Sequence, residues 1–184
     1  MIPKKYSPSG LLTILTFLIL MIVPPLPGQD KAGTDPVKSP LAKSANKANG
    51  NFDAVADKAL LAMKKRAEEL NVKGVALVAY AEGDTVQAWS SKMVVVGHLT
   101  DGQSATRKGN NLLGIAYTKA AEMADTLKDS GSKVRPPMTG EYGYQGGLVA
   151  KGKTGILIVA FSGGPSEDDL KVSHAGMDIM ASNL

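Results

Sequence analysis

The stretch GLVAKGKTGILIVAFSGG, residues 147–164, decides between two folds for this chain. Its first eight residues match G-x-x-x-x-G-K-T, a phosphate-binding loop that works only where a strand enters it and a helix leaves it. After Lys153, however, the chain continues with GILIVAF, an apolar run rich in β-branched residues that is typical of a buried strand. KGKTG therefore predicts the turn of a β-hairpin, and the sequence argues against nucleotide binding.

The segments around this hairpin predict an α+β fold. Apolar residues at helical spacing predict helices over about 51–70, over 111–127 and from Ser166 onward. The runs 74–81 and 85–97 predict two more strands, joined by the turn EGD. Because the strands come as hairpins, we expect an antiparallel sheet of about five strands, covered by the helices in a single domain.

Two helix ends carry recognisable signals. The first helix should stop at NVKG, where Gly74 is free to take a left-handed conformation. At the start of the third helix, Ser166 and Asp169 have the spacing of a capping box, and the acidic residues 167–169 suit the helix dipole. This acidic turn would repel a phosphate, so we expect no anion site at the Gly163-Gly164 corner.

The first 50 residues predict export and a spacer. Lys4 and Lys5 precede the uncharged run Leu11–Val23 and the helix-breaking PPLPGQD, an order typical of a secretory signal peptide over residues 1–28. The run is shorter than the roughly 20 residues of a membrane-spanning helix, and an uncleaved anchor is the alternative. Residues 29–50 predict a disordered linker before a domain at 51–184. We expect a secreted or periplasmic protein.

Composition narrows the classes of function. Without Lys4 and Lys5 the chain has 19 basic against 17 acidic residues, which gives no argument for nucleic-acid binding. The chain has no cysteine and two histidines, too few for a structural zinc site. Ser162 and Ser166 are nucleophiles by residue type only, because the G-x-S-x-G elbow is absent. An enzyme is therefore the less favoured hypothesis.

The C-terminal part of the chain resembles a known family. Residues 146–180 are similar to the C-terminal signature of the GlcG/HbpS family, which also forms the C-terminal domain of PduO-type proteins. The matching features are Gly146-Gly147, Gly152 in the hairpin, Ser162-Gly163-Gly164, the acidic turn 166–169 and Ala175-Gly176. The similarity extends loosely over residues 54–184. The chain departs from the family pattern after Lys92-Met93 and in a polar stretch before the second helix.

The resemblance implies a profilin-like (GlcG-like) fold that is often oligomeric. Several members of the family bind haem, some of them outside the cell as partners of a redox-sensing kinase. In this chain the candidate iron ligands are His98, where a strand gives way to a loop, and His174, with Met177 one helical turn further on. Arg107 and Arg135 lie in two long loops and could pair with haem propionates.

The leading hypothesis is an exported, non-catalytic protein that binds a small ligand such as haem. The first alternative is a structural or signalling module that binds a protein partner, for example a sensor protein, and no cofactor. The second alternative is an enzyme that acts on a small organic acid or a peroxide. We also expect a homo-oligomer that binds no nucleic acid and contacts a membrane only through an uncleaved N-terminal segment.

Overall fold

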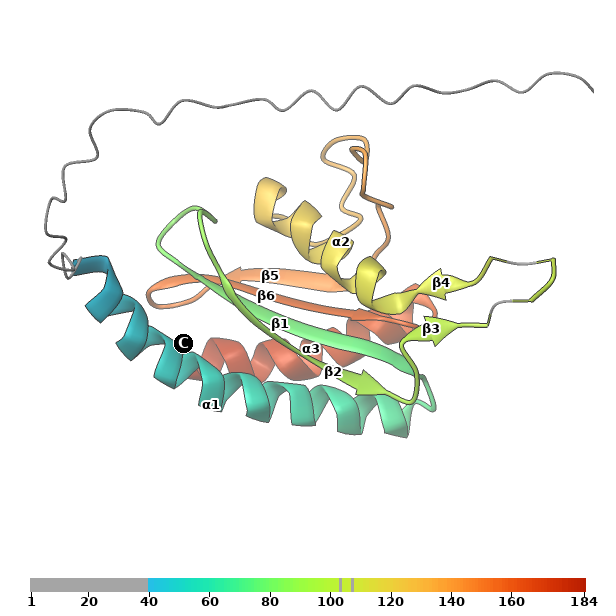
Figure 1. Ribbon diagram of the computed structural model, residues 1–184, viewed down its shortest axis with the longest axis horizontal. Coiled ribbons are helices and arrows are strands. Elements are labelled where there is room, and N and C mark those ends of the chain that lie inside the picture. Colours follow the sequence, from blue (N-terminus) through green and yellow to red (C-terminus); the bar gives the residue numbers. More distant parts are fainter. Residues whose placement is uncertain (1–39, 103, 107) are drawn as a thin grey trace, which may run out of the picture. The chain divides into compact units, whose positions relative to one another are not determined.

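A computed structural model describes residues 40–102, 104–106 and 108–184. The predicted signal peptide, 1–28, and residues 29–39 of the predicted linker lie outside the described residues. No helix in the described part of the chain is long and apolar enough to span a membrane. The elements in chain order are α1 (Pro40–Glu69), β1 (Gly74–Glu82), β2 (Ser90–Val96), β3 (Thr100–Asp101), β4 (Asn110–Asn111), α2 (Leu112–Thr126), β5 (Gly147–Lys151), β6 (Gly155–Ser162) and α3 (Ser166–Asn183) (Figure 1).

A four-stranded antiparallel sheet in the order β2-β1-β6-β5 forms the centre of the domain. β1 pairs with both neighbours, so that Val78 lies opposite Lys92 of β2 and opposite Val159 of β6. β3 and β4 pair with each other in a separate two-stranded sheet. The predicted antiparallel α+β domain is confirmed, with four strands in the main sheet instead of about five.

Helices cover both faces of the sheet (Figure 1). Side chains of a strand alternate between the two faces, and the two central strands, β1 and β6, therefore supply two separate cores. On one face, Val78 and Val159 pack with α1 and α3. On the other face, Leu77 and Ile158 pack with α2. Every residue of β6 is buried, as the apolar run in the sequence predicts.

The hairpin predicted around the KGKTG turn is confirmed. β5 and β6 are antiparallel neighbours, with Val149 opposite Ile158, and the backbone N–H of Gly152 donates to the carbonyl of Gly155 at 2.8 Å across the turn. The residues after Lys153 enter a central strand and not a helix. The segment therefore lacks the strand-to-helix geometry on which a phosphate-binding loop depends.

Both ends of α1 differ from the prediction. The helix begins at Pro40 instead of near Asn51, so residues 40–50 of the predicted linker are helical. At the other end it is Asn71 that takes the left-handed conformation, with φ of 53°, while Val72 N donates to Ala67 O at 2.9 Å. Gly74 instead begins β1, where a Cβ would collide with the carbonyl oxygen of Ser162.

The predicted capping box of α3 is wrong. Pro165 occupies the N-cap position, and no side chain there makes a capping hydrogen bond. Asp169 is 3% exposed, and its Oδ1 accepts a hydrogen bond from Gly164 N at 2.9 Å, in the corner that precedes the helix. The Asp169 side chain is drawn inside because its other oxygen pairs with a buried lysine of α2.

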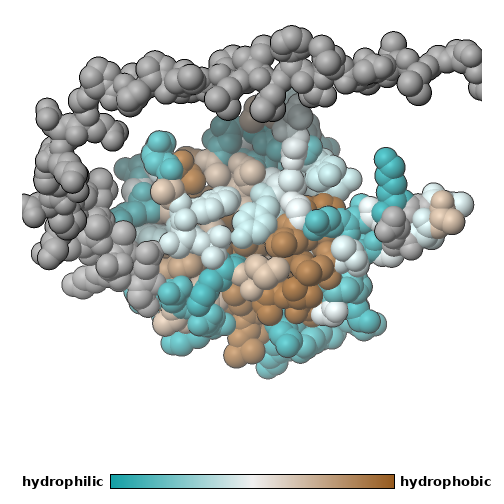
Figure 2. All heavy atoms as spheres, in the orientation of Figure 1, coloured by the Kyte–Doolittle hydropathy of each residue, from teal (hydrophilic) through white to brown (hydrophobic). Residues whose placement is uncertain are grey.

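Apolar side chains gather on one part of the surface. Figure 2 shows them over β2 and the adjoining part of α1, with hydrophilic side chains around them. β2 is an edge strand whose Met93, Val94 and Val95 are half-buried, and Leu61 of α1 is 69% exposed. A sheet edge of this kind offers backbone groups with which a further strand can pair.

Candidate functional site

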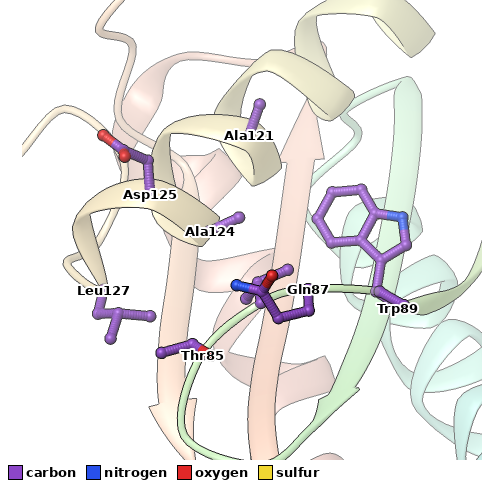
Figure 3. Close-up of a pocket in the computed structure, with 9 residues that line it drawn as sticks. Thr85, Gln87, Trp89, Ala121, Ala124, Asp125 and Leu127 are labelled. Atoms are coloured by element: carbon purple, nitrogen blue, oxygen red, sulfur yellow. The ribbon is translucent and has the colours of Figure 1, made fainter.

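A groove opens between the residues that join β1 to β2 and the C-terminal half of α2 (Figure 3). Its volume of about 630 Å³ lies in the range typical of pockets for small organic ligands. The residues that line it are Thr85, Val86, Gln87, Ala88, Trp89, Ala121, Ala124, Asp125 and Leu127.

Small side chains on one wall and a large aromatic on another create this groove. Ala121 and Ala124 of α2 leave space between the helix and the loop, while the indole of Trp89 and the side chain of Leu127 lie at opposite ends (Figure 3). The ring of Trp89 packs against Tyr117 with centroids 6.5 Å apart. The Tyr117 hydroxyl is in turn 3.3 Å from that of Ser91 in β2, so the aromatic wall is held by the sheet as well as by the helix.

Leu127 separates this groove from a second hollow. The second hollow, of about 270 Å³, is lined by Leu127 together with residues of the β1–β2 loop and of the β5–β6 hairpin: Asp84, Val149, Ala150, Lys151 and Ile156. Leu127 caps α2 in the left-handed conformation, with φ of 51° and its N–H bonded to Met123 O. Glycine or asparagine usually takes that position, so a leucine there destabilises the end of the helix.

A smaller polar cavity lies where β6 ends and α3 begins. Its volume is about 150 Å³, and its lining is mostly polar: Asp101, Asn110, Leu112, Ile115, Lys119, Tyr144, Gln145, Ser162, Gly163, Gly164, Ser166 and Asp169. The β3–β4 hairpin, α2, the end of β6 and the first turn of α3 all contribute to the wall. We call it the Lys119 cavity.

A buried ion pair forms part of the wall of the Lys119 cavity. Lys119 Nζ donates to Asp169 Oδ2 and to the backbone carbonyl of Phe161, both at 2.7 Å. The two side chains are 2% and 5% exposed. Burial lowers the pKa of Lys119 and raises the pKa of Asp169, since removal from water disfavours both charged forms and their mutual attraction offsets this only in part.

Ser162 adds a hydroxyl to the same cavity. It is the last residue of β6, it is 3% exposed, and no described residue makes a hydrogen bond with its side chain. Among the described residues, no fully buried side-chain nitrogen or oxygen lacks a hydrogen-bond partner, so the Ser162 oxygen must reach accessible space. Ser162 therefore offers a donor and an acceptor to whatever occupies the cavity.

Arg135 is engaged within the protein. Its guanidinium donates to both oxygens of Glu141, at 2.7 and 2.8 Å, and to Asp125 Oδ2 at 2.8 and 3.0 Å. The hydrogen bonds from Arg135, with one from the backbone N–H of Met138, lower the pKa of Glu141 to about 2. Arg135 thus holds together the irregular connection 127–146, and its charge is already balanced by two carboxylates.

The structure does not bring the other predicted haem residues together. His98 is exposed in the turn after β2, and His174 is exposed on α3. Met177 is 9% exposed and packs in the core between α1, α3 and the sheet. None of the three lines the groove or the Lys119 cavity, and Arg107 lies outside the described residues. No group of three or more potential metal-ligating side chains occurs in the described part of the chain.

The position of Lys119 in the sequence already indicates a buried lysine, although the regular apolar stripe of α2 draws attention away from it. Lys119 lies on the apolar stripe of α2, four residues after Ile115 and four before Met123, both of which are buried. A charged residue on the core face of a helix needs a partner. Its partner, Asp169, is explained equally well by the sequence as a helix-capping residue, and only the tertiary structure reveals the pair.

Neither a scan against protein-family models nor a search of curated proteins finds a match to this chain. The similarity to the GlcG/HbpS family stays an expectation from the C-terminal motif.

Proposed function

We propose that the protein is a non-catalytic binder of a planar aromatic organic ligand, held in the groove beside Trp89. The observation that carries this proposal is the half-buried indole at one end of a groove of about 630 Å³ whose helical wall is made of alanines. A flat molecule can lie against that wall with its face or edge toward the indole, an arrangement in which aromatic rings attract each other.

The rim of the groove suits a ligand with polar groups at its periphery. Thr85 and Gln87 are exposed and lie on the loop side (Figure 3), and no described residue makes a hydrogen bond with either side chain. Asp125 lies on the helix side and is held by Arg135. These groups can fix the orientation of the ligand, while the apolar surface contributes most of the binding free energy.

Haem held through its iron does not fit these residues. Side chains that hold haem iron are His, Met, Tyr and Cys, and none of these lines the groove. The guanidinium of Arg135 is bonded to Glu141 and Asp125, and a propionate would have to displace one of them. A tetrapyrrole bound in this groove would therefore be held by its ring, with no contribution from a metal.

Trp89 is the only tryptophan of the chain and reports directly on the groove. We would titrate the protein with hemin and, in parallel, with iron-free protoporphyrin IX, and follow the quenching of Trp89 fluorescence with correction for absorption by the ligand. Binding by ring contact predicts saturable quenching at one site and affinities for the two ligands within about threefold. His98→Ala and His174→Ala should leave both titrations unchanged.

A matched pair of variants tests the location. Ala121 lines the groove and is exposed, so Ala121→Phe should fill the groove without disturbing the core and weaken binding by about tenfold or more. Ala54, exposed on α1, provides the control Ala54→Phe, which should bind as the wild type does. Binding of hemin alone, lost in either histidine variant, would overturn the groove proposal in favour of iron ligation, and absence of quenching by both ligands would reject it outright.

A further inference from the structure

The Lys119 cavity is separate from the Trp89 groove and has room for a small molecule. No residue lines both of them. A volume of about 150 Å³ is several times the roughly 30 Å³ that one water molecule takes up in the liquid. The cavity can therefore hold an organic molecule of a few non-hydrogen atoms, such as a short aldehyde or ketone.

Lys119 has one unused position at its nitrogen. An ammonium group has three N–H donors, and two of them are used by Phe161 O and Asp169 Oδ2. The side of Gly146 is closed, because a Cβ at that glycine would lie 2.5 Å from Nζ. When Asp169 takes the proton of their shared hydrogen bond, the nitrogen lone pair faces Asp169, and rotation about the Cε–Nζ bond turns it toward the third position.

Asp169 can receive the proton that Lys119 gives up. Its Oδ2 is 2.7 Å from Nζ, while its Oδ1 is held by the N–H of Gly164. Burial acts on the two groups in the direction of a neutral amine beside a neutral carboxyl, because it lowers the pKa of Lys119 and raises that of Asp169. A desolvated lysine beside a proton acceptor is the arrangement that makes an amine nucleophilic toward carbonyl carbon.

Ser162 and the local charge indicate the class of ligand. The hydroxyl of Ser162 lines the cavity and can donate to a carbonyl oxygen. The charges of Lys119 and Asp169 cancel within the buried pair, so the pair offers no net positive charge to an anionic ligand. A neutral carbonyl compound needs no such charge.

We propose that the Lys119 cavity is a carbonyl-binding site, in which Lys119 condenses with a small neutral aldehyde or ketone to form an imine. Nζ attacks the carbonyl carbon, a C–N bond forms, and the carbonyl oxygen becomes a hydroxyl hydrogen-bonded to Ser162. The C–O bond then breaks, and the oxygen leaves as water with the two protons that the amine loses. Asp169 accepts the proton released by the ammonium at the start and returns a proton to the departing oxygen, so no other reactant is consumed.

The test is reductive trapping on the folded, full-length chain. We would incubate the protein at pH 7 with acetaldehyde and cyanoborohydride, and measure by peptide mass mapping how fast each lysine is alkylated. Imine formation in the cavity predicts that Lys119 reacts several-fold faster than exposed Lys133 and Lys153, because burial lowers the pKa of Lys119 and so raises its fraction of neutral amine. The exposed lysines serve as internal controls within one sample.

The pH dependence and two variants complete the test. The preference for Lys119 should be largest at low pH, and the other titratable groups that face it are Asp169 from α3, Asp101 from β3 and Tyr144 from the 127–146 connection. Lys119→Arg should remove the fast phase and leave the labelling of Lys133 unchanged, and Ser162→Ala should slow Lys119 several-fold. If Lys119 in the folded protein reacts no faster than Lys153, or only after unfolding in urea, the proposal is wrong and the ion pair is purely structural.

Discussion

The side chains of Lys119 and Asp169 connect helices on opposite faces of the sheet. Lys119 belongs to α2, which covers one face, and Asp169 belongs to α3, which covers the other with α1. Nζ and Oδ2 meet at 2.7 Å at the C-terminal end of β6, where Lys119 also donates to the carbonyl of Phe161. The pair thus links the two cores at one end of the sheet, and the stability of the pair is coupled to the geometry of the Lys119 cavity.

Removal of one partner of this pair should be costly. Lys119→Met would leave the Asp169 carboxylate buried beside an apolar side chain, and we expect the free energy of unfolding to fall by about 3–5 kcal/mol. The double variant Lys119→Met/Asp169→Leu should recover much of that loss, because neither charge is then buried. Urea unfolding at pH 7 measures both. A single variant within 1 kcal/mol of the wild type would show that water reaches the pair.

The same pair should give an unusual dependence of stability on pH. Burial raises the pKa of Asp169 in the folded chain above its ordinary value of 3.8, so the unfolded chain loses this proton first as the pH rises. The contribution of Asp169 to stability is therefore full below 3.8 and falls as the pH rises through the folded pKa. We expect the free energy of unfolding of the wild type, minus that of Asp169→Asn, to decrease with pH in this window. A difference that increases with pH would mean that the attraction of Lys119 outweighs burial.

The sequence predicts the elements well because their signals are local. The apolar run of β6, the KGKTG turn and the helical stripe of α2 each depend on neighbours within a few residues, and all three are confirmed. The groove beside Trp89 could not be predicted in this way. It depends on how closely the 85–89 loop approaches Ala121 and Ala124, a distance set by the packing of α2 on the sheet.

Glu141 should titrate well below an ordinary glutamate. Its pKa is lowered to about 2 by hydrogen bonds from Arg135 and from Met138 N, and its contribution to stability is present above 4.5 and lost as the pH falls toward 2. NMR titration of the side-chain carboxyl would measure this pKa directly. Arg135→Gln should raise it toward 4.5 and speed amide hydrogen exchange in residues 127–146. An unchanged pKa in that variant would assign the shift to the backbone N–H alone.

Leu127 should destabilise the fold while it forms part of the wall of the groove. Its left-handed conformation costs a non-glycine residue about 1–2 kcal/mol, and its side chain is 42% exposed, so little burial compensates. Leu127→Gly should therefore raise the free energy of unfolding by about 0.5–1 kcal/mol. The same variant should bind protoporphyrin IX more weakly, because the wall between the two hollows is lost. A more stable variant with unchanged affinity for protoporphyrin IX would show that Leu127 does not contribute to ligand binding.

Two helical glycines should respond in opposite ways to the same substitution. In α3 a Cβ at Gly176 would lie 2.5 Å from Met63 Sδ and 3.1 Å from Val159 Cγ1, both in the core between α1, α3 and the sheet. In α2 a Cβ at Gly114 would find its nearest neighbour, Asn111, at 3.6 Å. Alanine is better than glycine inside a helix by about 1 kcal/mol, but overpacking of a core costs about 1–3 kcal/mol.

Gly176→Ala should therefore lower the free energy of unfolding, although it improves the helix, and Gly114→Ala should raise it by up to about 1 kcal/mol. Urea unfolding of the two variants at the same pH measures both effects against one wild-type curve. Met63 is fully buried, so its sulfur can yield only by a change of rotamer against the surrounding core or by a shift of α1 away from α3. If Gly176→Ala is also stabilising, then the Met63 side chain or the spacing of the two helices accommodates the methyl group without loss of the core.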